Sequence, residues 1–128
     1  MKKDNTRDYI TSAFRLYARW GERSAKEVEE IVNECDANEL PADLGALLAD
    51  VDAVDKMMKL YSDEGKPEVI AAVRAVYFYR AKAPLRSGEI SGRVRRHACE
   101  AHCCEKEVYR MLAEARQRAA RIRGLRIE

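Results

Sequence analysis

The last third of the chain constrains the fold most, because two helical patterns there flank a short break at residues 102–104. Before the break, apolar residues recur at helical spacing, at Ile90, Val94, Ala98 and Ala101. After the break the same spacing returns, at Val108, Met111, Leu112 and Ala115. Helix-turn-helix proteins use two helices joined by a tight turn in this way, and the second helix enters the major groove of DNA. The pattern therefore predicts a helix-turn-helix unit.

The helix-turn-helix frame can be placed on the sequence with Val108 as the buried β-branched residue of the second helix. Ala98 then takes the small position where the helices cross, and Cys103 and Met111 take the other buried positions. His102 falls at the left-handed turn position that usually holds glycine, a backbone region that histidine tolerates better than most residues. Cys104 stands where serine or threonine usually caps the second helix.

The frame leaves several side chains on the outer face of the second helix: Cys104, Glu105, Lys106, Tyr109, Arg110 and Ala113. Lys106 and Arg110 can donate to guanine edges, and Tyr109 can reach a phosphate or a thymine methyl group. Other arginines are expected to contact phosphates and position the unit without reading sequence: Arg93, Arg96, Arg116, Arg118 and Arg121. Together with Glu105, these residues form the predicted DNA-binding set.

The charge is unevenly distributed along the chain, although the net charge is only +2. Residues 22–68 hold five basic and fourteen acidic side chains, whereas residues 69–128 hold fourteen basic and six acidic ones. A nucleic-acid footprint confined to one end would give this distribution. Charged helices that share their charges unevenly by chance are the alternative, and the arginine bias near the C-terminus argues against it.

At 128 residues, the chain is long enough for one domain with its own core. No apolar run approaches the roughly 18 residues of a membrane helix, and the first residues lack the apolar segment of a signal peptide. We therefore expect a cytoplasmic protein. Its four cysteines, Cys35, Cys99, Cys103 and Cys104, are then expected to be reduced thiols.

The rest of the chain also reads as helical. Helices are expected over residues 5–20, 24–34, 41–61 and 68–82, and Ser24 and Glu27 form a capping-box pattern. Pro41 and Pro67 suit first helical positions, and Gly65 suits a helix C-terminus. The prediction is an all-α protein of about six helices. Residues 1–66 would form an N-terminal helical bundle with an acidic, partner-binding middle, and residues 67–128 would form the helix-turn-helix region.

Three groups of residues suggest other chemistry. Asp50, Asp52 and Asp55 lack the glycine turn and closing glutamate of a calcium loop, so a solvated acidic face is expected.

A zinc site could use ligands of the right type at His97, Cys99, His102, Cys103 and Cys104. All five fall within eight consecutive residues, however, and Cys35 would have to complete the site. A cysteine nucleophile with a histidine base is a further alternative, but no glycine-rich oxyanion or phosphate loop accompanies it. We expect no enzyme activity, no metal and no cofactor.

Two strings of residues carry a family resemblance. Val108-Tyr-Arg-Met-Leu112 and the ending Arg123-Gly-Leu-Arg-Ile127 resemble the C-terminal part of phage- and prophage-encoded regulators of the RinA and ArpU type. The helix-turn-helix of that family is similar to the fourth conserved region of bacterial sigma factors. The resemblance implies a transcriptional regulator without catalysis or cofactor. Cys104 at the cap, and the polar run at residues 95–97, depart from the family pattern.

The sequence thus predicts a sequence-specific, double-stranded-DNA-binding transcriptional regulator of phage or prophage type. RNA polymerase is a further candidate partner, a homodimer is one option for its oligomeric state, and no membrane partner is expected. Two alternatives stay open: a protein-interaction module, and a DNA-binding subunit of a phage packaging machine resembling a terminase small subunit.

Overall fold

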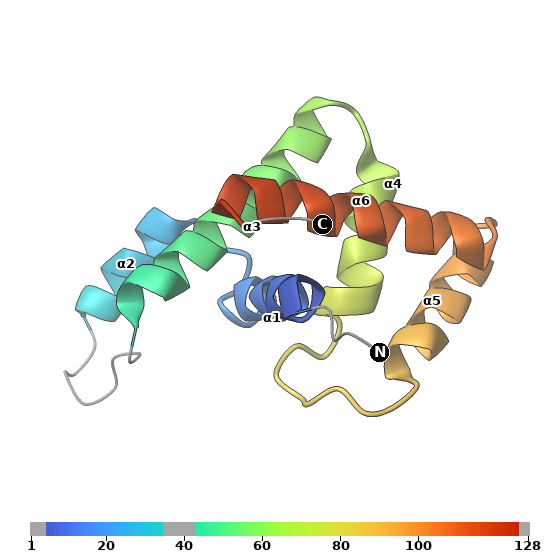
Figure 1. Ribbon diagram of the computed structural model, residues 1–128, viewed down its shortest axis with the longest axis horizontal. Helices are drawn as coiled ribbons and strands as arrows, with labels where there is room; N and C mark the ends of the chain where they lie inside the picture. Colours follow the sequence, from blue (N-terminus) through green and yellow to red (C-terminus); the bar gives the residue numbers. More distant parts are fainter. Residues whose placement is uncertain (1–4, 35–42, 126–128) are drawn as a thin grey trace.

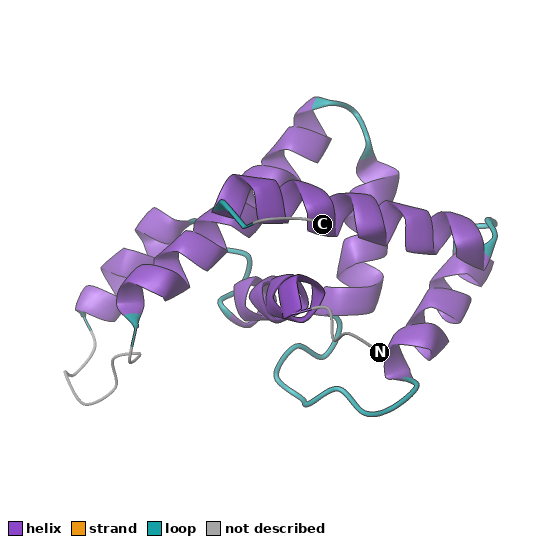
Figure 2. Cartoon of the chain, in the orientation of Figure 1, coloured by secondary structure: helices purple, strands orange, loops and turns teal. Residues whose placement is uncertain are grey.

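The protein is all-α, as a computed structural model of residues 5–34 and 43–125 shows (Figures 1 and 2). No strand occurs in this described part of the chain. Over these described ranges, six α-helices and a π-helical segment follow one another: α1 (Asn5–Arg19), α2 (Ala25–Asn33), α3 (Leu44–Asp63), α4 (Pro67–Val73), η2 (Arg74–Phe78), α5 (Glu89–Glu100) and α6 (Glu105–Arg123). The predicted fold class is therefore confirmed. No helix within these residues is long and apolar enough to cross a membrane.

Local signals set several helix ends where the sequence predicts them. The Ser24 hydroxyl accepts from the Glu27 backbone N–H at 3.3 Å, and the Glu27 carboxylate accepts from the Ser24 N–H at 3.3 Å. This capping box begins α2 and confirms the prediction. Gly65 ends α3 in the left-handed conformation (φ 69°), and Pro67 is the first residue of α4. The predicted start of the third helix at Pro41 lies outside the described residues. The Asp43 carboxylate caps α3 by accepting from the Ala46 N–H at 2.9 Å.

One hydrophobic core joins residues from both sides of the sequence boundary near residue 66. α6 packs against α1, α3, α4 and α5, so the C-terminal helix lies across most of the molecule (Figure 1). The largest fully buried side chains include Phe14 of α1, Tyr61 and Met57 of α3, and Leu112 of α6. A mutation in the core of α6 is therefore expected to destabilise the N-terminal helices as well.

The segment after α4 differs from the prediction of one helix to about residue 82. The α-helix ends at Val73, and residues 74–78 form η2, in which the Tyr79 N–H donates to the Arg74 carbonyl at 3.0 Å. Turns follow over residues 79–83, where Arg80 has a left-handed backbone (φ 50°). An α-helix cannot continue through such a residue without strain. Helical structure therefore forms over most of residues 68–82, but it ends at Phe78, about one turn before the predicted end.

Arg15 is a hydrogen-bond donor for the backbone carbonyl groups at the end of this helical segment, residues 77–83. Its guanidinium is buried and donates to the carbonyls of Tyr77 (3.2 Å), Arg80 (3.1 Å) and Ala81 (3.4 Å), and to that of Ala83. Burial lowers the pKa of Arg15, and the charges of two nearby arginines lower it further. A buried cation is stable only with such partners. Arg15 thus replaces the backbone N–H groups that a continued helix would have supplied.

The expected solvated acidic face of α3 is wrong for two of its three aspartates. Asp55 is buried, and its carboxylate accepts from the Tyr17 hydroxyl at 2.8 Å. Asp50 accepts from the Tyr9 hydroxyl at 2.7 Å and from Arg123 Nε at 2.8 Å. Both carboxylates therefore link α3 to other helices, because each lies at an interface with α1 rather than in solvent. Asp52, paired with Lys56 at 2.9 Å, remains on the surface.

Candidate nucleic-acid interface

The turn between α5 and α6 has the backbone conformation that the helix-turn-helix frame predicts. Residues 101–104 separate the helices, and His102 has φ 56°, in the left-handed region. The Ala101 N–H donates to the His97 carbonyl at 2.8 Å, and the Cys103 N–H donates to the Ala98 carbonyl at 3.0 Å. These bonds close α5 and reverse the chain. The left-handed turn residue, expected although it is not glycine, is confirmed.

The predicted buried positions of the frame are also confirmed. Ala98, Val108 and Met111 are 4%, 0% and 4% exposed, and Cys103 is partly buried against the same core. Ala101 is the exception on the predicted apolar stripe, because it lies exposed in the turn. The two helices are thus fixed to each other and to the remaining helices by small and β-branched side chains at their crossing.

The N-terminus of α6 lacks a side-chain cap. Cys104 has the extended backbone of a capping residue (φ −85°, ψ 157°), but its side chain makes no capping hydrogen bond. Its carbonyl accepts from the Val108 N–H at 3.3 Å, which begins the helix. Glu105 and Glu107 lie in the first turn, where negative charge offsets the helix dipole. The Cys104 side chain therefore supplies no partner for the first N–H groups of α6, although the Cys104 carbonyl also accepts from the Glu107 N–H at 3.1 Å.

Lys106, Tyr109 and Arg110 lie on the outer face of α6, as predicted. All three are exposed, and Tyr109 is 40% exposed, which is high for a tyrosine ring. Arg121 is exposed further along the same helix. These side chains form an exposed stripe that follows α6 from its first turn to its last. A duplex lying along α6 would meet this stripe first.

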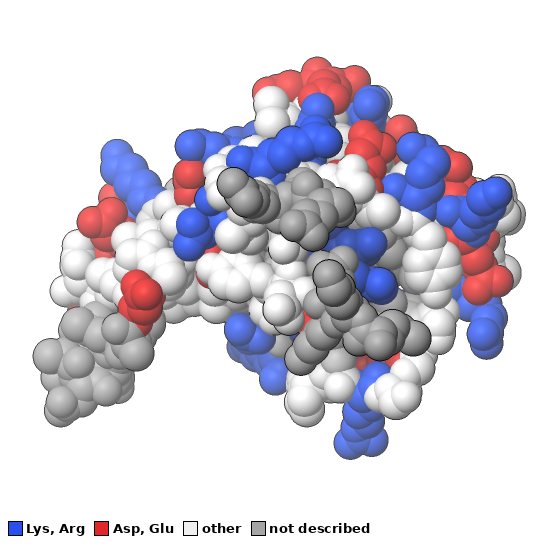
Figure 3. Space-filling model, viewed as in Figure 1, with Lys and Arg blue, Asp and Glu red and all other residues white. Residues whose placement is uncertain are grey.

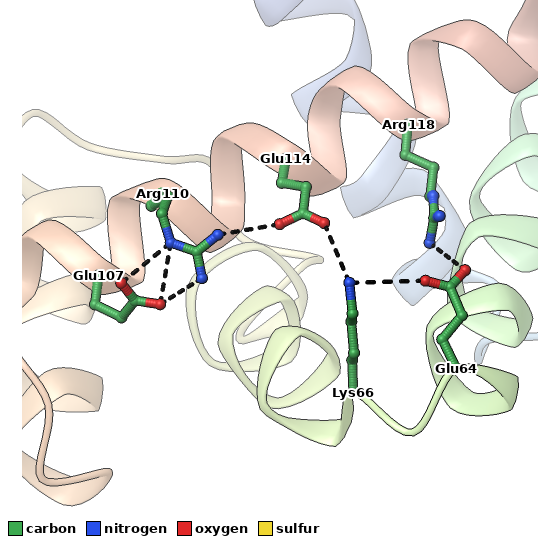
Figure 4. Close-up of polar contacts among 6 residues, drawn as sticks. All are labelled: Glu64, Lys66, Glu107, Arg110, Glu114 and Arg118. Atoms are coloured by element: carbon green, nitrogen blue, oxygen red, sulfur yellow. Dashed lines mark hydrogen bonds and ion pairs between the residues drawn. The ribbon is translucent and has the colours of Figure 1, made fainter.

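Arg110 is held by two carboxylates of its own helix (Figure 4). Its Nε lies 3.1 Å from both carboxylate oxygens of Glu107, and a second guanidinium nitrogen lies 3.3 Å from Glu114. Hydrogen bonding to Glu107 raises the pKa of Arg110 and lowers the pKa of Glu107. The residue predicted to read a guanine is therefore neutralised locally, and binding DNA requires it to exchange these partners.

The ion pairs continue from Glu114 to the turn between α3 and α4 (Figure 4). Lys66 lies 3.9 Å from Glu114 and 3.8 Å from Glu64, and Glu64 in turn lies 2.8 Å from Arg118. The Arg118 guanidinium also lies 4.6 Å from the centre of the Tyr61 ring. Arg118, predicted to contact phosphate, is thus partly engaged in joining α6 to α3.

Two other predicted phosphate contacts have structural partners. Arg116 donates to the Tyr77 hydroxyl at 2.6 Å. Arg93 is a correction, because it is 7% exposed rather than outward-facing; it donates to the Val76 carbonyl at 2.8 Å and to Glu89 at 2.9 Å. The frame missed this because α5 packs against η2, so the side of α5 that carries Arg93 is covered. Arg96 on the same helix is exposed.

The surface charge near α5 and α6 is mixed. On the face shown in Figure 3, basic and acidic side chains lie beside one another rather than in a region of one sign. Glu105, the acidic member of the predicted set, lies 3.9 Å from Arg95. The basic excess in the sequence of this region is therefore reduced on the surface by local pairing.

The cysteines and histidines of the turn do not assemble a metal site within the described residues, where no three potential ligands come together. Cys99 and Cys104 are exposed and Cys103 is partly buried, and all three are free thiols. Cys35, which the zinc alternative would need, lies outside the described residues. Comparison with protein-family models, curated proteins and solved structures finds no match to this chain in any of the three. The resemblance to RinA and ArpU regulators therefore rests on the quoted residues alone.

Proposed function

We propose that the protein binds double-stranded DNA through α5, the 101–104 turn and α6, and acts as a transcriptional regulator of phage or prophage type. One observation carries the proposal: the turn has the left-handed His102, and the residues around it are buried or exposed in the order that the frame requires. A left-handed residue without glycine is uncommon, so its occurrence at the predicted position is more specific than two adjacent helices.

The proposed mode of binding places the N-terminal half of α6 in the major groove. Lys106 and Arg110 would donate to base edges, and Tyr109 would contact the sugar-phosphate backbone or a thymine methyl group. Arg96 and Arg121 would contact phosphates on either side, since both are exposed. Arg110 can leave Glu107 and Glu114 readily, because exposed ion pairs contribute little to stability.

Glu107 and Glu114 would also restrict where the protein binds. Once Arg110 turns to a base, Glu107 loses its partner and Glu114 keeps only Lys66, at 3.9 Å, so both carboxylates would repel nearby phosphates more strongly. A site with guanine at the right position offsets this repulsion, whereas other DNA does not. The pairing in the free protein would therefore favour discrimination between sequences more than overall affinity.

The test begins with duplexes selected from random DNA, whose binding is followed by fluorescence anisotropy. Arg110→Ala should reduce the preference for one base pair by about tenfold to a hundredfold while retaining binding to random DNA. Arg74→Ala is the matched control, because Arg74 is also exposed and ion-paired, at 2.9 Å from Glu22, but lies outside the unit. An Arg110→Ala protein with unchanged preference would show that Arg110 reads no base.

The dependence on salt separates DNA binding from the main alternative. Phosphate contacts predict a linear fall of log affinity with log salt concentration on many DNA sequences. If no DNA binds at low salt, a protein-interaction module is favoured, in which the acidic residues of 22–68 would contact a partner. Specific binding that neither activates nor represses a promoter would instead favour the DNA-packaging role.

A further inference from the structure

A cleft of about 600 Å³ lies between α5 and the segment that precedes it. Four arginines line it, namely Arg80, Arg86, Arg93 and Arg96, together with the exposed ring of Tyr79. Among the described residues that line the cleft, Glu89 is the only one with a carboxylate. The cleft is separate from the exposed stripe on α6, because its walls come from residues 79–96.

The arginines converge on the tyrosine ring. The guanidinium carbons of Arg80, Arg93 and Arg96 lie 5.4, 5.3 and 4.9 Å from the ring centre. The Arg93 guanidinium is also held in place by the hydrogen bonds that it donates to the Val76 carbonyl and to Glu89. One wall of the cleft therefore holds a preorganised cation, while Arg80, Arg86 and Arg96 remain exposed and adjustable.

The charge of the cleft is unbalanced. Four guanidinium groups face a single carboxylate, and that carboxylate is already paired with Arg93 at 2.9 Å. Like charges in one cleft repel one another, and an anion would relieve this repulsion. The backbone that presents Arg80 is itself held in a left-handed conformation, and the buried Arg15 binds the carbonyl groups of Arg80 and Ala83. The structure thus fixes the side chain of Arg93 and the backbone that carries Arg80, while the side chains of Arg86 and Arg96 stay adjustable.

We propose that this cleft binds the dianionic phosphate of a small phosphomonoester, a ligand of nucleotide size. Guanidinium groups match phosphate oxygens with paired donors, and an arginine cluster is the usual receptor for a phosphomonoester. A dianion suits an excess of three positive charges better than the single charge of a backbone phosphodiester. The volume also lies in the range of small-molecule sites, about 300–1,000 Å³.

Tyr79 supplies a second contact and a spectroscopic probe. Its pKa lies below the ordinary value, first because Arg96 can donate to the phenolate oxygen and then because of the charge of Arg80. A bound dianion would compete for these arginines and add negative charge nearby. The pKa of Tyr79 should therefore rise when the cleft is occupied. The proposal does not depend on DNA binding by α6.

The experiment uses the full chain and two probes, inorganic phosphate and adenosine monophosphate, in isothermal titration calorimetry at about 0.15 M salt. Arg96→Gln should weaken binding of either probe by about tenfold or more. Arg95→Gln is the matched control, since Arg95 is the neighbouring exposed arginine of α5 but does not line the cleft, and it should bind as the parent does. Arg86→Gln gives a second loss variant if Arg96→Gln is unstable.

The outcomes are separable. Tighter binding of the nucleotide than of phosphate identifies a ligand with an organic group, and equal binding identifies the phosphate alone; both support the site. The absorbance titration of Tyr79, taken as the difference from Tyr79→Phe, should shift to higher pH with ligand. The proposal is overturned if neither probe binds, if Arg95→Gln and Arg96→Gln weaken binding equally, or if Arg96→Gln reduces only the affinity for duplex DNA.

Discussion

Replacing Arg15 tests whether one buried guanidinium determines where the helix after α4 ends. Arg15→Met keeps an unbranched apolar stem but removes all the donors of the side chain. The bonds to the Tyr77 and Ala81 carbonyls are buried, whereas those to Arg80 and Ala83 are only partly buried. Water can replace Arg15 at the partly buried carbonyls, so the main loss falls on the two buried ones.

The magnitude follows from these bonds. An unsatisfied buried carbonyl costs about 1–3 kcal/mol, so two of them would cost at most about 2–6 kcal/mol, less what the long Arg19 bond to Ala81 (3.5 Å) retains. Burying the charged guanidinium costs desolvation free energy in the parent protein. Arg15→Met removes this cost, and the gain offsets part of the loss. We therefore expect Arg15→Met to lower the free energy of unfolding by about 2–4 kcal/mol. Arg15→Lys keeps the charge but not the planar fork, and should lower it by about 1–2 kcal/mol.

Urea denaturation followed by circular dichroism measures the change, and amide hydrogen exchange locates it. Exchange should accelerate most in residues 77–83, because their carbonyls lose the side chain that holds them. Arg19→Met is the control: Arg19 lies one turn further along α1, is exposed, and makes one long bond of 3.5 Å to the Ala81 carbonyl. It should change the free energy of unfolding by less than about 0.5 kcal/mol.

The reasoning would be refuted by an Arg15→Met protein that unfolds at the urea concentration of the parent. It would also be refuted if Arg15→Met and Arg19→Met destabilise equally, because burial would then have no bearing on the effect. If Arg15→Met does not fold, the Arg15→Lys protein still tests the reasoning. A loss of stability in Arg15→Lys shows that the planar guanidinium is needed, and no loss shows that the positive charge is sufficient.

Three further predictions concern the α5–α6 turn and the core. Cys104→Ser should stabilise the protein by about 0.5–1 kcal/mol in urea denaturation, because it supplies the missing cap of α6; no gain would mean the cap position is wrong. His102→Gly should stabilise and His102→Val destabilise, by about 0.5–1 kcal/mol or more, since φ is 56°; the reverse order would contradict a left-handed turn. Burial, and next the charge of Glu114, raise the pKa of Tyr61 to about 12. As the pH rises, Tyr61 therefore loses its proton in the unfolded chain before it does so in the folded protein. Stability should fall as the pH rises from about 10 to 12, and Tyr61→Phe should reduce that fall.

Features set by neighbours in sequence could be predicted. The capping box at Ser24, the left-handed Gly65 and the turn at His102 depend on residues within a few positions, and the structure has all three. The buried faces of α1, α3 and α6 also follow from helical spacing, because an apolar stripe must be covered whichever partner covers it. This local information was sufficient for the fold class and for the position of the turn.

Features set by distant partners could not be predicted. The pattern of residues 68–82 stays helical in sequence, but the carbonyls at its end bind Arg15, more than 60 residues earlier. Asp50 and Asp55 look like surface residues until Tyr9, Tyr17 and Arg123 are placed beside them. A helical pattern shows which face of a helix is apolar, but it does not show what meets the charged residues at the edge of that face.

The sequence also does not show which arginines of the basic half, residues 69–128, are buried or paired. This affects how the proposed function should be tested. Arg93 is buried, and Arg110 and Arg118 pair with carboxylates, so the sequence excess of arginine overstates the positive charge that a partner can reach. Within the described residues, the cations of the two proposed sites lie apart, in the outer stripe of α6 and in the cleft around Tyr79, while Arg74, Lys82 and Arg95 are exposed outside both. A single duplex contact need not cover both. Charge substitutions in the stripe and in the cleft should therefore be combined in a double-mutant cycle on DNA affinity, in which independent sites give additive effects and one continuous footprint does not.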